Sequence, residues 1–596
     1  MEQLKKRIHK NILAILIGFT VVFMTGCSLE NQDAENEPQQ AEQETTNTIQ
    51  AMDENAEIPI VDNNMLYVDD DDSVVTMYLT VRQGNAAENT NHTWEEINGH
   101  SVYYYEDLGI ERYQVEGILQ VGDENGPVEG ELGYGASVPN TIISIRGQTS
   151  STEPVKSYKI SIKDEKGSWR DQKVINLNKH AYDGVRFRNK LCYDLMKTLP
   201  GMISLRTQFV HLYVKDETVE GNAKFQDCGL YTQVEQPNKT FLKNHGLDKF
   251  GQLYKINFFE FFQYEDTIML KSDANYDVTA FEKLLEIKGD DDHSKLIAML
   301  KDVNDYSKPI EEVFGKWFNE DNFFSWLAFH ILVGNVDTQS RNTLIYSPLN
   351  VNKWYFISWD NDYSFKLLEM KLDKSQVDDG WEYGISNYWS NVLYRRILKS
   401  EYYRNILDHK IEEYRKIITE DRVTTMVANY NAIAWKYRNS LPDILHNRLT
   451  NEEYLQVCDE MPTEIEKNYE AYKKSLEAPM PFYIGVPSTK DGKLYFDWDV
   501  AYDFDAENIT YDFELAKDYT FSAPIEKAEG LNIPEFETNM LAAGQYFIKV
   551  LAENESGYMQ YAFDYYNTEH GAVFGVKCFY VLPDGSIVED VYEEGE

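Results

Sequence analysis

The order of elements between residues 323 and 362 constrains the fold more than any other feature of this chain. An apolar run from Phe323 to Val333 predicts a buried helix. Two short apolar runs, Thr343 to Tyr346 and Trp354 to Ile357, are separated by a polar turn and predict a β-hairpin. The polar segment between helix and hairpin is therefore bordered by buried elements on both sides.

That polar segment contains Asp337 and Asn342, separated by four residues. The interval is that of the kinase catalytic loop, in which the Asp orients or deprotonates an acceptor hydroxyl and the Asn binds magnesium. The spacing alone is a weak signal, because an Asn also follows Asp171 and Asp503 at the same interval. The position between helix and hairpin carries the prediction; the alternative is a solvated turn with chance polar residues.

Two further carboxylates follow the predicted hairpin, at Asp360 and Asp362. In kinases, the corresponding hairpin delivers an Asp that chelates the magnesium bridging the nucleotide phosphates. Magnesium is a hard cation that prefers carboxylate, amide and phosphate oxygens. We therefore predict Asn342 and Asp360 as metal ligands, with Asp362 as an additional ligand.

A phosphate-binding turn is predicted far upstream, where Arg146 begins the polar sequence that contains Ser150 and Ser151. A turn of this kind presents backbone N–H groups and a guanidinium to phosphate. In the following strand, Lys156 falls on the packed side, where a buried ammonium needs an anionic partner. Lys156 is the first candidate for phosphate binding and Lys159 the alternative; both are equally compatible with surface lysines on an edge strand.

Several short motifs occur in a characteristic order along about 200 residues of this chain. Together they resemble the CotH kinase family, the spore-coat-protein-H-like proteins, over roughly residues 70 to 420. The motifs are Arg146-Gly147-x2-Ser150-Ser151, Lys156-Ser157-Tyr158, Gly229-Leu230-Tyr231-x3-Glu235, Asn335-x-Asp337-x4-Asn342 and Trp359-Asp360-x-Asp362.

The resemblance implies an α+β chain with an atypical bilobal protein-kinase-like fold that binds ATP and Mg²⁺ or Mn²⁺. It further implies phosphorylation of Ser or Thr in secreted or coat proteins. Asp337 would be the catalytic residue, and Asn342 and Asp360 the metal ligands. Glu235 would lie where a kinase hinge meets adenine, or else serve as a carboxylate at a helix start, where the helix dipole favours it.

Several departures from ordinary kinases accompany this resemblance. The chain has no Gly-x-Gly-x2-Gly loop, Asn335 replaces the catalytic-loop His, and Asn361 and Asp362 replace Phe and Gly. The helix predicted from Val185 to Leu199 offers no Glu for the usual lysine ion pair. These departures leave open whether the chain is an active kinase or a pseudokinase that has lost activity. The alternative function is a non-catalytic cell-surface adhesion or scaffold protein that uses the fold as a binding module.

The N-terminus predicts export. Basic residues precede an apolar run from Ile12 to Met24, which is shorter than the ~20 residues of a membrane-spanning helix. The following Thr-Gly-Cys resembles a bacterial lipobox, so residues 1–27 are expected to be a lipoprotein signal peptide with Cys27 lipidated. Residues 28–60 predict a disordered tether. We expect lipid anchoring to the outer face of the bacterial cytoplasmic membrane, at the cell surface or in the spore coat.

The remaining chain divides into regions of distinct pattern. Residues 61–478 form the expected kinase-like domain, with a strand-rich N-lobe over 61–235 and a helical C-lobe over 236–478. Residues 481–567 alternate like strands of a small sandwich and resemble a fibronectin type III domain through Trp498 and Tyr546. Residues 568–596 are either one more hairpin or a tail.

The net charge of the chain limits the classes of molecule that it can bind. The 57 Lys and Arg against 100 Asp and Glu give a formal net charge of -43, which repels nucleic acid. A nucleic-acid partner is therefore disfavoured and none is expected, while a protein partner and a membrane contact through the lipid anchor are expected. The cysteines have no metal-ligand spacing and fit free thiols at least as well as disulfides.

Overall fold

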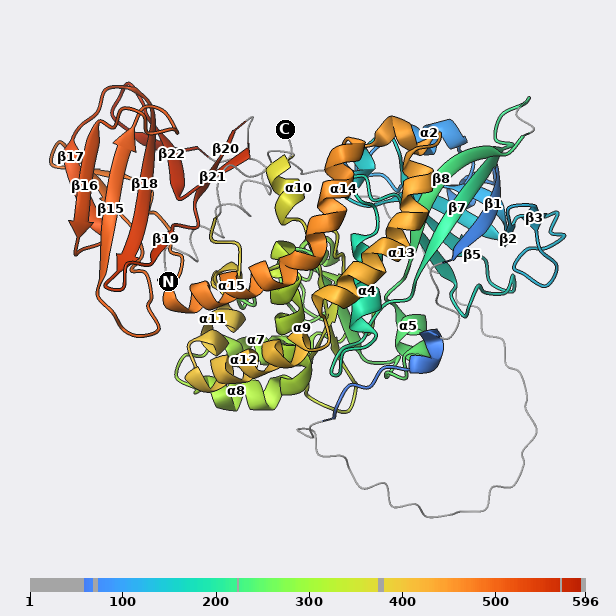
Figure 1. Cartoon of the computed structure of the whole chain (residues 1–596), viewed down its shortest axis with the longest axis horizontal. Coiled ribbons are helices and arrows are strands. Elements are labelled where there is room, and N and C mark those ends of the chain that lie inside the picture. Colours follow the sequence, from blue (N-terminus) through green and yellow to red (C-terminus); the bar gives the residue numbers. More distant parts are fainter. Residues whose placement is uncertain (1–57, 68–72, 222–223, 373–379, 569–570, 591–596) are drawn as a thin grey trace, which may run out of the picture. The chain divides into compact units, whose positions relative to one another are not determined.

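The fold is seen in a computed structural model that describes residues 58–67, 73–221, 224–372, 380–568 and 571–590 (Figure 1). The class is α+β, as predicted. The predicted signal peptide, Cys27 and most of the tether lie outside the described residues. Among the helices in these ranges, none has both the length and the apolar character needed to cross a bilayer.

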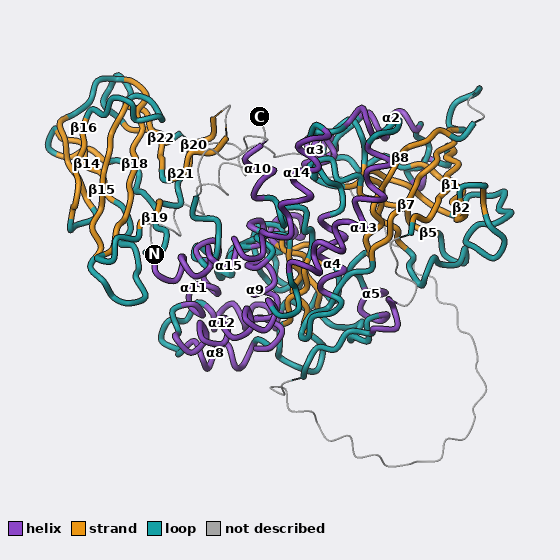
Figure 2. Tube along the Cα trace, viewed as in Figure 1, coloured by secondary structure: helices purple, strands orange, loops and turns teal. Residues whose placement is uncertain are grey.

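The N-lobe is built on one eight-stranded sheet whose pairings close into a ring. Figure 2 shows β1, β2, β5, β7 and β8 of this sheet gathered in one group of strands. Because β1 pairs with both β7 and β2, the order β1-β7-β8-β6-β5-β4-β2 returns to its first strand, and β3 adds to β2. Closure removes the free edges of the sheet. The strands are β1 Val74–Arg82, β2 Val115–Asp123, β3 Gly126–Pro127, β4 Thr141–Arg146, β5 Ser157–Ile162, β6 Val174–Asn178, β7 Thr207–Asp216 and β8 Gln226–Glu235.

The alternation along these strands separates an apolar core from a polar outer face. Ile145 and Ile160 are buried in the apolar cluster of this lobe. Arg146 follows Ile145 in β4, and Lys159 precedes Ile160 in β5. Because successive side chains in a strand alternate between faces, both point to the opposite side of the sheet. The outer face of β4 and β5 therefore carries the cationic groups.

Two helices in the N-lobe were not predicted, because the first part of this strand-rich region was interpreted as strands and turns. They are α2 Trp94–Gly99 and α3 Val102–Leu108. A capping box between Thr93 and Glu96 begins α2, and Ser101 caps α3. This local signal overrides the strand-like composition of the segment.

The C-lobe is mainly helical, as predicted, and contains a small sheet of order β10-β9-β11-β12. Its strands are β9 Gln252–Ile256, β10 Leu285–Ile287, β11 Thr343–Ser347 and β12 Tyr355–Ser358. Its helices are α5 Lys239–Asn244, α6 Val278–Leu284, α7 Ser294–Val303, α8 Ile310–Trp317, α9 Glu320–Leu332, α10 Leu367–Leu372, α11 Val392–Leu398, α12 Glu401–Arg415, α13 Glu420–Arg438, α14 Asn451–Glu460 and α15 Glu464–Glu477.

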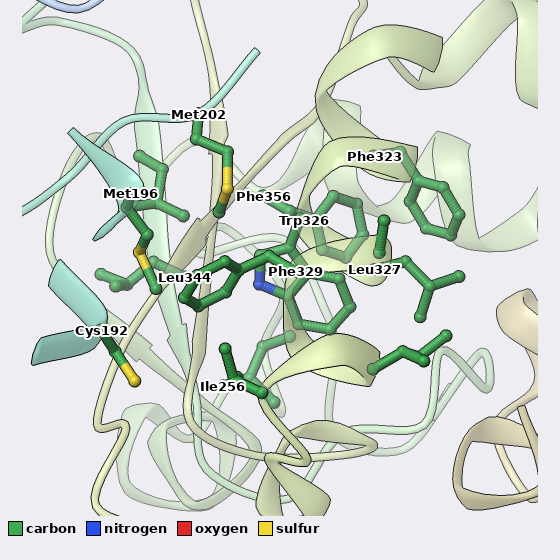
Figure 3. Packing of buried hydrophobic residues seen from close by; sticks show 14 of the residues in the cluster. Cys192, Met196, Met202, Ile256, Phe323, Trp326, Leu327, Phe329, Leu344 and Phe356 are labelled. Atoms are coloured by element: carbon green, nitrogen blue, oxygen red, sulfur yellow. The ribbon is translucent and has the colours of Figure 1, made fainter. Parts of the chain in front are cut away.

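Helix α9 is the centre of the largest apolar core. Every residue from Asn322 to Leu332 is buried, which agrees with the prediction of a buried helix. Figure 3 shows Trp326 of α9 beside Phe356 of β12, with Leu344 of β11 and Met196 of α4 (Arg188–Met196) nearby. The N-lobe helix α4 thus belongs to the core that holds the hairpin.

The C-terminal region forms two facing sheets around its own apolar cluster. One sheet has the order β13-β14-β17, and the other has the order β16-β15-β18-β22-β23 with β19 beside β18. The strands are β13 Ser488–Lys490, β14 Lys493–Asp497, β15 Ile509–Ala516, β16 Glu526–Leu531, β17 Glu535–Asn539, β18 Gly544–Asn554, β19 Met559–Tyr561, β22 Val576–Val581 and β23 Ile587–Glu589. A separate hairpin is formed by β20 Tyr565–Thr568 and β21 Gly571–Phe574.

The predicted boundary of this module at residue 567 is too early. Since β22 pairs with β18, residues 576–581 belong to the same sheet as the predicted strands, and β22 and β23 form the additional hairpin. Trp498 is buried, and the Tyr546 hydroxyl donates to the Ala542 carbonyl at 2.9 Å. A tyrosine hydroxyl bonded to backbone a few residues upstream is the geometry of a tyrosine corner.

The start of the described chain is packed rather than tether-like. The Ile58 carbonyl accepts a hydrogen bond from the Tyr355 hydroxyl at 2.7 Å, and Ile60 belongs to the C-lobe core. Residues 58–60, which were predicted to belong to the tether, are therefore part of the packed fold. The Asp62 carboxylate accepts from His245 Nδ1 at 2.5 Å and fixes the segment further.

His245 and Glu235 form a buried ion pair with Nε2 and Oε2 3.0 Å apart. Arg206 adds a second cation at 2.5 Å from Glu235 Oε1. Burial opposes the charged imidazolium, yet the hydrogen bonds that His245 donates to Asp62 and Glu235 raise its pKa to about 9. The cluster thus contributes stability below the ordinary His pKa near 6.5, and this contribution is lost as pH rises through about 9.

We expect His245→Gln to reduce the free energy of unfolding by about 2 kcal/mol at pH 6, because it removes one member of a buried charge pair. The difference from wild type should shrink by pH 9.5. Urea unfolding at both pH values measures it, with the exposed His409→Gln as the matched control. An equal loss at both pH values would contradict the charged state assigned to His245.

Candidate functional site

The loop after α9 presents Asp337 on a short turn. Gly334 has φ of +63°, and a Cβ there would lie 2.7 Å from the Asn468 side chain, so the position requires glycine. Asn335 begins the 3₁₀ turn Val336–Thr338, and its Oδ1 accepts from the Asp337 backbone N–H at 3.3 Å. The Asn found where kinases have His therefore caps the turn that carries Asp337.

Asp337 lies between an amide and a guanidinium. Asn342 Nδ2 donates to Asp337 Oδ2 at 2.7 Å, and Arg341 Nε lies 3.3 Å from Oδ1. Burial raises the pKa of Asp337 to about 6; the Asp360 charge also raises it, while Arg341 opposes the shift. A carboxylate with this pKa is ionised at neutral pH and can accept a proton from a positioned hydroxyl.

The β-hairpin brings Asn342 and Asp360 together. In the antiparallel register Thr343 lies opposite Ser358, and the Trp359 N–H donates to the Asn342 carbonyl at 3.2 Å. Asn342 and Asp360 both have φ of +53°, in the left-handed region that asparagine and aspartate tolerate best. Because Asn342 uses its nitrogen on Asp337, its amide oxygen points away from that carboxylate.

Helix α4 orients Asp360. Asn189 Nδ2 donates to Asp360 Oδ1 at 2.9 Å, and the Asp360 N–H donates to the Tyr193 hydroxyl at 3.1 Å. Asn189 Oδ1 also accepts from the Asn361 N–H at 2.6 Å. Sequence reasoning missed Asn189 and Tyr193, because the helical periodicity of α4 says nothing about a residue 171 positions further along the chain.

The carboxylates fit a hard divalent cation. Burial, and then the Asp360 charge, raise the pKa of Asp362 well above its ordinary range, and the Asp337 charge adds to the shift. A divalent cation would relieve this repulsion, and amide and carboxylate oxygens are suitable donors. Within the described ranges, no three His, Cys, Asp or Glu side chains already form a metal cluster. Asn342, Asp360 and Asp362 would therefore hold the ion together with phosphate oxygens.

Cationic groups face these carboxylates from the N-lobe and the small sheet. The Arg146 guanidinium lies 5.9 Å from the Trp359 ring centroid. Burial lowers the pKa of Arg146, and the Asp360 charge opposes the shift. Burial likewise lowers the pKa of Lys255, with Glu286, 4.0 Å away, and Asp360 opposing. Lys255 was missed, since β9 carries no motif that distinguishes it.

Comparison with protein-family models gives a match over the kinase-like region of the chain. The family model described as "CotH kinase protein" matches residues 143–472, which is more than half of the chain. The chain belongs to the CotH kinase family. This establishes the kinase-like bilobal fold that the resemblance implied, followed by the β-rich C-terminal module. It also establishes a kinase-like function in general terms.

Two solved structures show weak likeness. One is the Shewanella oneidensis MR-1 toxin–antitoxin complex of HipA, HipB and operator DNA, with 12% identity, 50% of this chain and 58% of that chain covered, and a TM-score of 0.19. The other is the twitchin kinase region from C. elegans, with 10% identity, 71% of each chain covered and a TM-score of 0.15. Neither likeness carries an argument at these scores. No curated protein matches this CotH family member.

The upstream candidates separate into two groups. Lys159 shares the outer face of the sheet with Arg146, and the Arg146 charge contributes to lowering its pKa, although burial is the largest cause. Lys156 is buried as predicted, but its Nζ donates to the Ser151 carbonyl at 2.6 Å. Lys159, the alternative candidate, is therefore within range of the Arg146 charge, whereas Lys156 is bonded to its own loop.

Ser150 and Ser151 lie in the 3₁₀ turn Thr149–Thr152. The Ser151 hydroxyl donates to the Gln148 carbonyl at 2.6 Å and accepts from the Val102 N–H at 2.9 Å, so it fastens the loop to α3. Gly147 has φ of +89°, and a Cβ there would lie 2.1 Å from Ser150 Oγ. Both serines shape the loop that follows Arg146.

Glu235 lies in the buried cluster of His245 and Arg206, where hydrogen bonds and charges overcome burial and lower its pKa to about 2. Both carboxylate oxygens take part in these ion pairs. The alternative of a helix-start carboxylate is not seen, because Asn238 caps α5. The role at an adenine-binding hinge stays a prediction.

We expect Asp337→Asn to stabilise the metal-free protein at pH 8 by about 2 kcal/mol. A folded-state pKa raised from about 4 to about 6 destabilises the ionised form above pH 6, and this cost disappears as pH falls below 4. Thermal unfolding in EDTA at pH 8 and pH 5 measures the difference. Asp305→Asn is the control and should not stabilise, since hydrogen bonds from Ser307 lower the pKa of Asp305.

Replacement of Asn189 by Ala should weaken Mn²⁺ binding in the presence of ATP by about 10- to 100-fold, as is typical when a residue that orients a metal ligand is lost. Calorimetric titration measures the affinity, and the exposed Asn405→Ala on α12 is the control. Unchanged affinity would show that Asp360 does not depend on this hydrogen bond.

Proposed function

We propose that this CotH family member is an extracytoplasmic, membrane-tethered atypical protein kinase. It would transfer the γ-phosphate of ATP to Ser or Thr hydroxyls of secreted or coat proteins. The observation that carries the proposal is the hairpin register, which joins the Asp337–Asn342 pair to Asp360. The cationic groups Arg146 and Lys255 add a phosphate-binding side to this constellation.

In the proposed reaction, the oxygen of the acceptor hydroxyl forms a bond to the γ-phosphorus. Asp337 accepts the proton that this hydroxyl loses. The bond from phosphorus to the β–γ bridging oxygen breaks, and ADP leaves with that electron pair. Arg341 and Asn342 hold the Asp337 carboxylate in place. Arg146 and Lys255 bind phosphate oxygens, which favours the anionic ligand by direct charge pairing. A divalent metal, when bound, neutralises charge on the β- and γ-phosphates.

The location rests on the lipobox-like sequence ending in Cys27 and on the tether that follows it. An anchored enzyme with a net charge of -43 suits a protein substrate outside the membrane and disfavours nucleic acid. The alternative is a non-catalytic adhesion or scaffold protein, and it becomes the conclusion if nucleotide binding occurs without transfer.

Two measurements test the kinase proposal. With radiolabelled ATP and Mn²⁺ or Mg²⁺, the purified protein should label itself or an added acceptor protein, and Asp337→Ala should reduce labelling by at least about 100-fold. ATP with Mn²⁺ should raise the melting temperature of wild type and Asp337→Ala but not of Asp360→Ala. Equal labelling by wild type and Asp337→Ala would exclude the assigned catalytic role.

A further inference from the structure

Residues 380–391, here called the bridging segment, contact the residues that precede and follow Asp337 in the sequence. Asn387 Nδ2 donates to the Val336 carbonyl at 3.1 Å, and the Tyr388 hydroxyl lies 2.9 Å from Thr338 Oγ1. Asn391 Nδ2 donates to the Gln339 carbonyl at 2.9 Å. The turn that presents Asp337 is thus held from outside by three side chains of one segment.

The bridging segment also approaches the catalytic carboxylate itself. Burial raises the pKa of Glu382 to about 7, and the charge of Asp337 contributes to that shift. Asp337 has φ −97° and ψ 31°, which is outside the helical region. The turn is therefore not a continuous helix, and its contacts with residues 387–391 hold it.

The same segment is packed against the C-terminal module. The Trp381 ring meets Phe563 edge-on, with centroids 4.9 Å apart, and Phe574 at 6.0 Å. A Cβ on Gly380 would lie 2.5 Å from the Phe574 ring. Phe563 belongs to the apolar core that contains α9, so the core continues from the C-lobe into the module.

A polar contact supports the same connection. Gln560, which is buried in β19, donates from Nε2 to Ser386 Oγ at 3.3 Å. Residues 386–388 form a single 3₁₀ turn, and α11 begins only at Val392. A segment with so little regular structure gains its order mainly from tertiary packing.

We propose that the C-terminal β-sandwich positions the catalytic turn through the bridging segment, with Trp381 as the positioning residue. The module would then be part of the catalytic unit as well as a surface domain. The predicted effect on phosphoryl transfer rests on the proposed function. The predicted effect on the order of residues 336–339 does not.

The test compares full-length wild type with Trp381→Ala and with Gln560→Leu. The second substitution removes the hydrogen bond to Ser386 and a local one that Gln560 accepts from the Tyr561 N–H. Ile533→Ala is the matched control, because Ile533 is an exposed apolar residue of the same module. Hydrogen–deuterium exchange of the peptides covering residues 336–342 and 384–391 measures how strongly the module orders the turn of Asp337, independently of activity. Thermal unfolding establishes that each variant is folded.

In Trp381→Ala we expect exchange in both peptides to accelerate by about fivefold or more, because the bridging segment loses its packing. The kcat of phosphoryl transfer should fall by about tenfold with little change in the KM for ATP, since the turn and not the nucleotide site is loosened. Gln560→Leu should show the same pattern to a smaller degree. If Trp381→Ala fails to fold, the exchange and kcat of Gln560→Leu alone test the proposal.

Unchanged exchange at residues 336–342 in both variants would overturn the proposal, as would faster exchange with unaltered kcat. If wild type itself transfers no phosphate, the proposed kinase function fails. Faster exchange in the variants would then still establish the structural connection. The two failures are therefore distinguishable.

Discussion

The antiparallel pairing of β11 with β12 is the interaction on which the site depends. It keeps Asn342 opposite Trp359, so that the end of the loop that carries Asp337 meets Asp360. A register slip of one residue would turn every side chain of the strand to the other face. The buried helix α9 prevents such a slip, because Trp326 and its neighbours pack directly on β12 (Figure 3).

The charges at this site are gathered against their electrostatic preference. Burial is the main reason that the pKa values of Asp337 and Asp362 are raised, and the Asp360 charge adds to both shifts. Arg341 opposes the shift of Asp337, and Lys366 opposes both. The left-handed backbone at Asn342 and Asp360 adds conformational cost. Such costs persist where the surrounding fold over-determines the geometry, and they are common at functional sites.

The departures from ordinary kinases have structural explanations here. Asn335 caps the turn of Asp337, and the Asn361 amide oxygen accepts from the Ser358 hydroxyl at 2.9 Å. Both residues thus stabilise the loop and the end of the hairpin. The contacts that the C-terminal module makes with residues 380–386 extend this support beyond the kinase-like domain.

Local sequence determined the elements and the residues that begin and end them. The apolar run before Asp337 predicts α9, the two runs after Asn342 predict the hairpin, and their order suffices to place Asp337, Asn342 and Asp360 in one site. These features depend on neighbours in the chain, where periodicity and turn chemistry act directly. The same reasoning missed α2 and α3, whose caps outweighed a strand-like composition.

Only the tertiary structure decided which distant side chains meet there. Asn189 reaches Asp360 because α4 joins the C-lobe core, and Lys255 comes within range of the Asp360 charge because β9 pairs with β11. Lys156 turns toward its own loop, although its strand position alone made it the first candidate. Contacts between residues hundreds of positions apart depend on how elements pack, and neither spacing nor periodicity in the sequence encodes that packing directly.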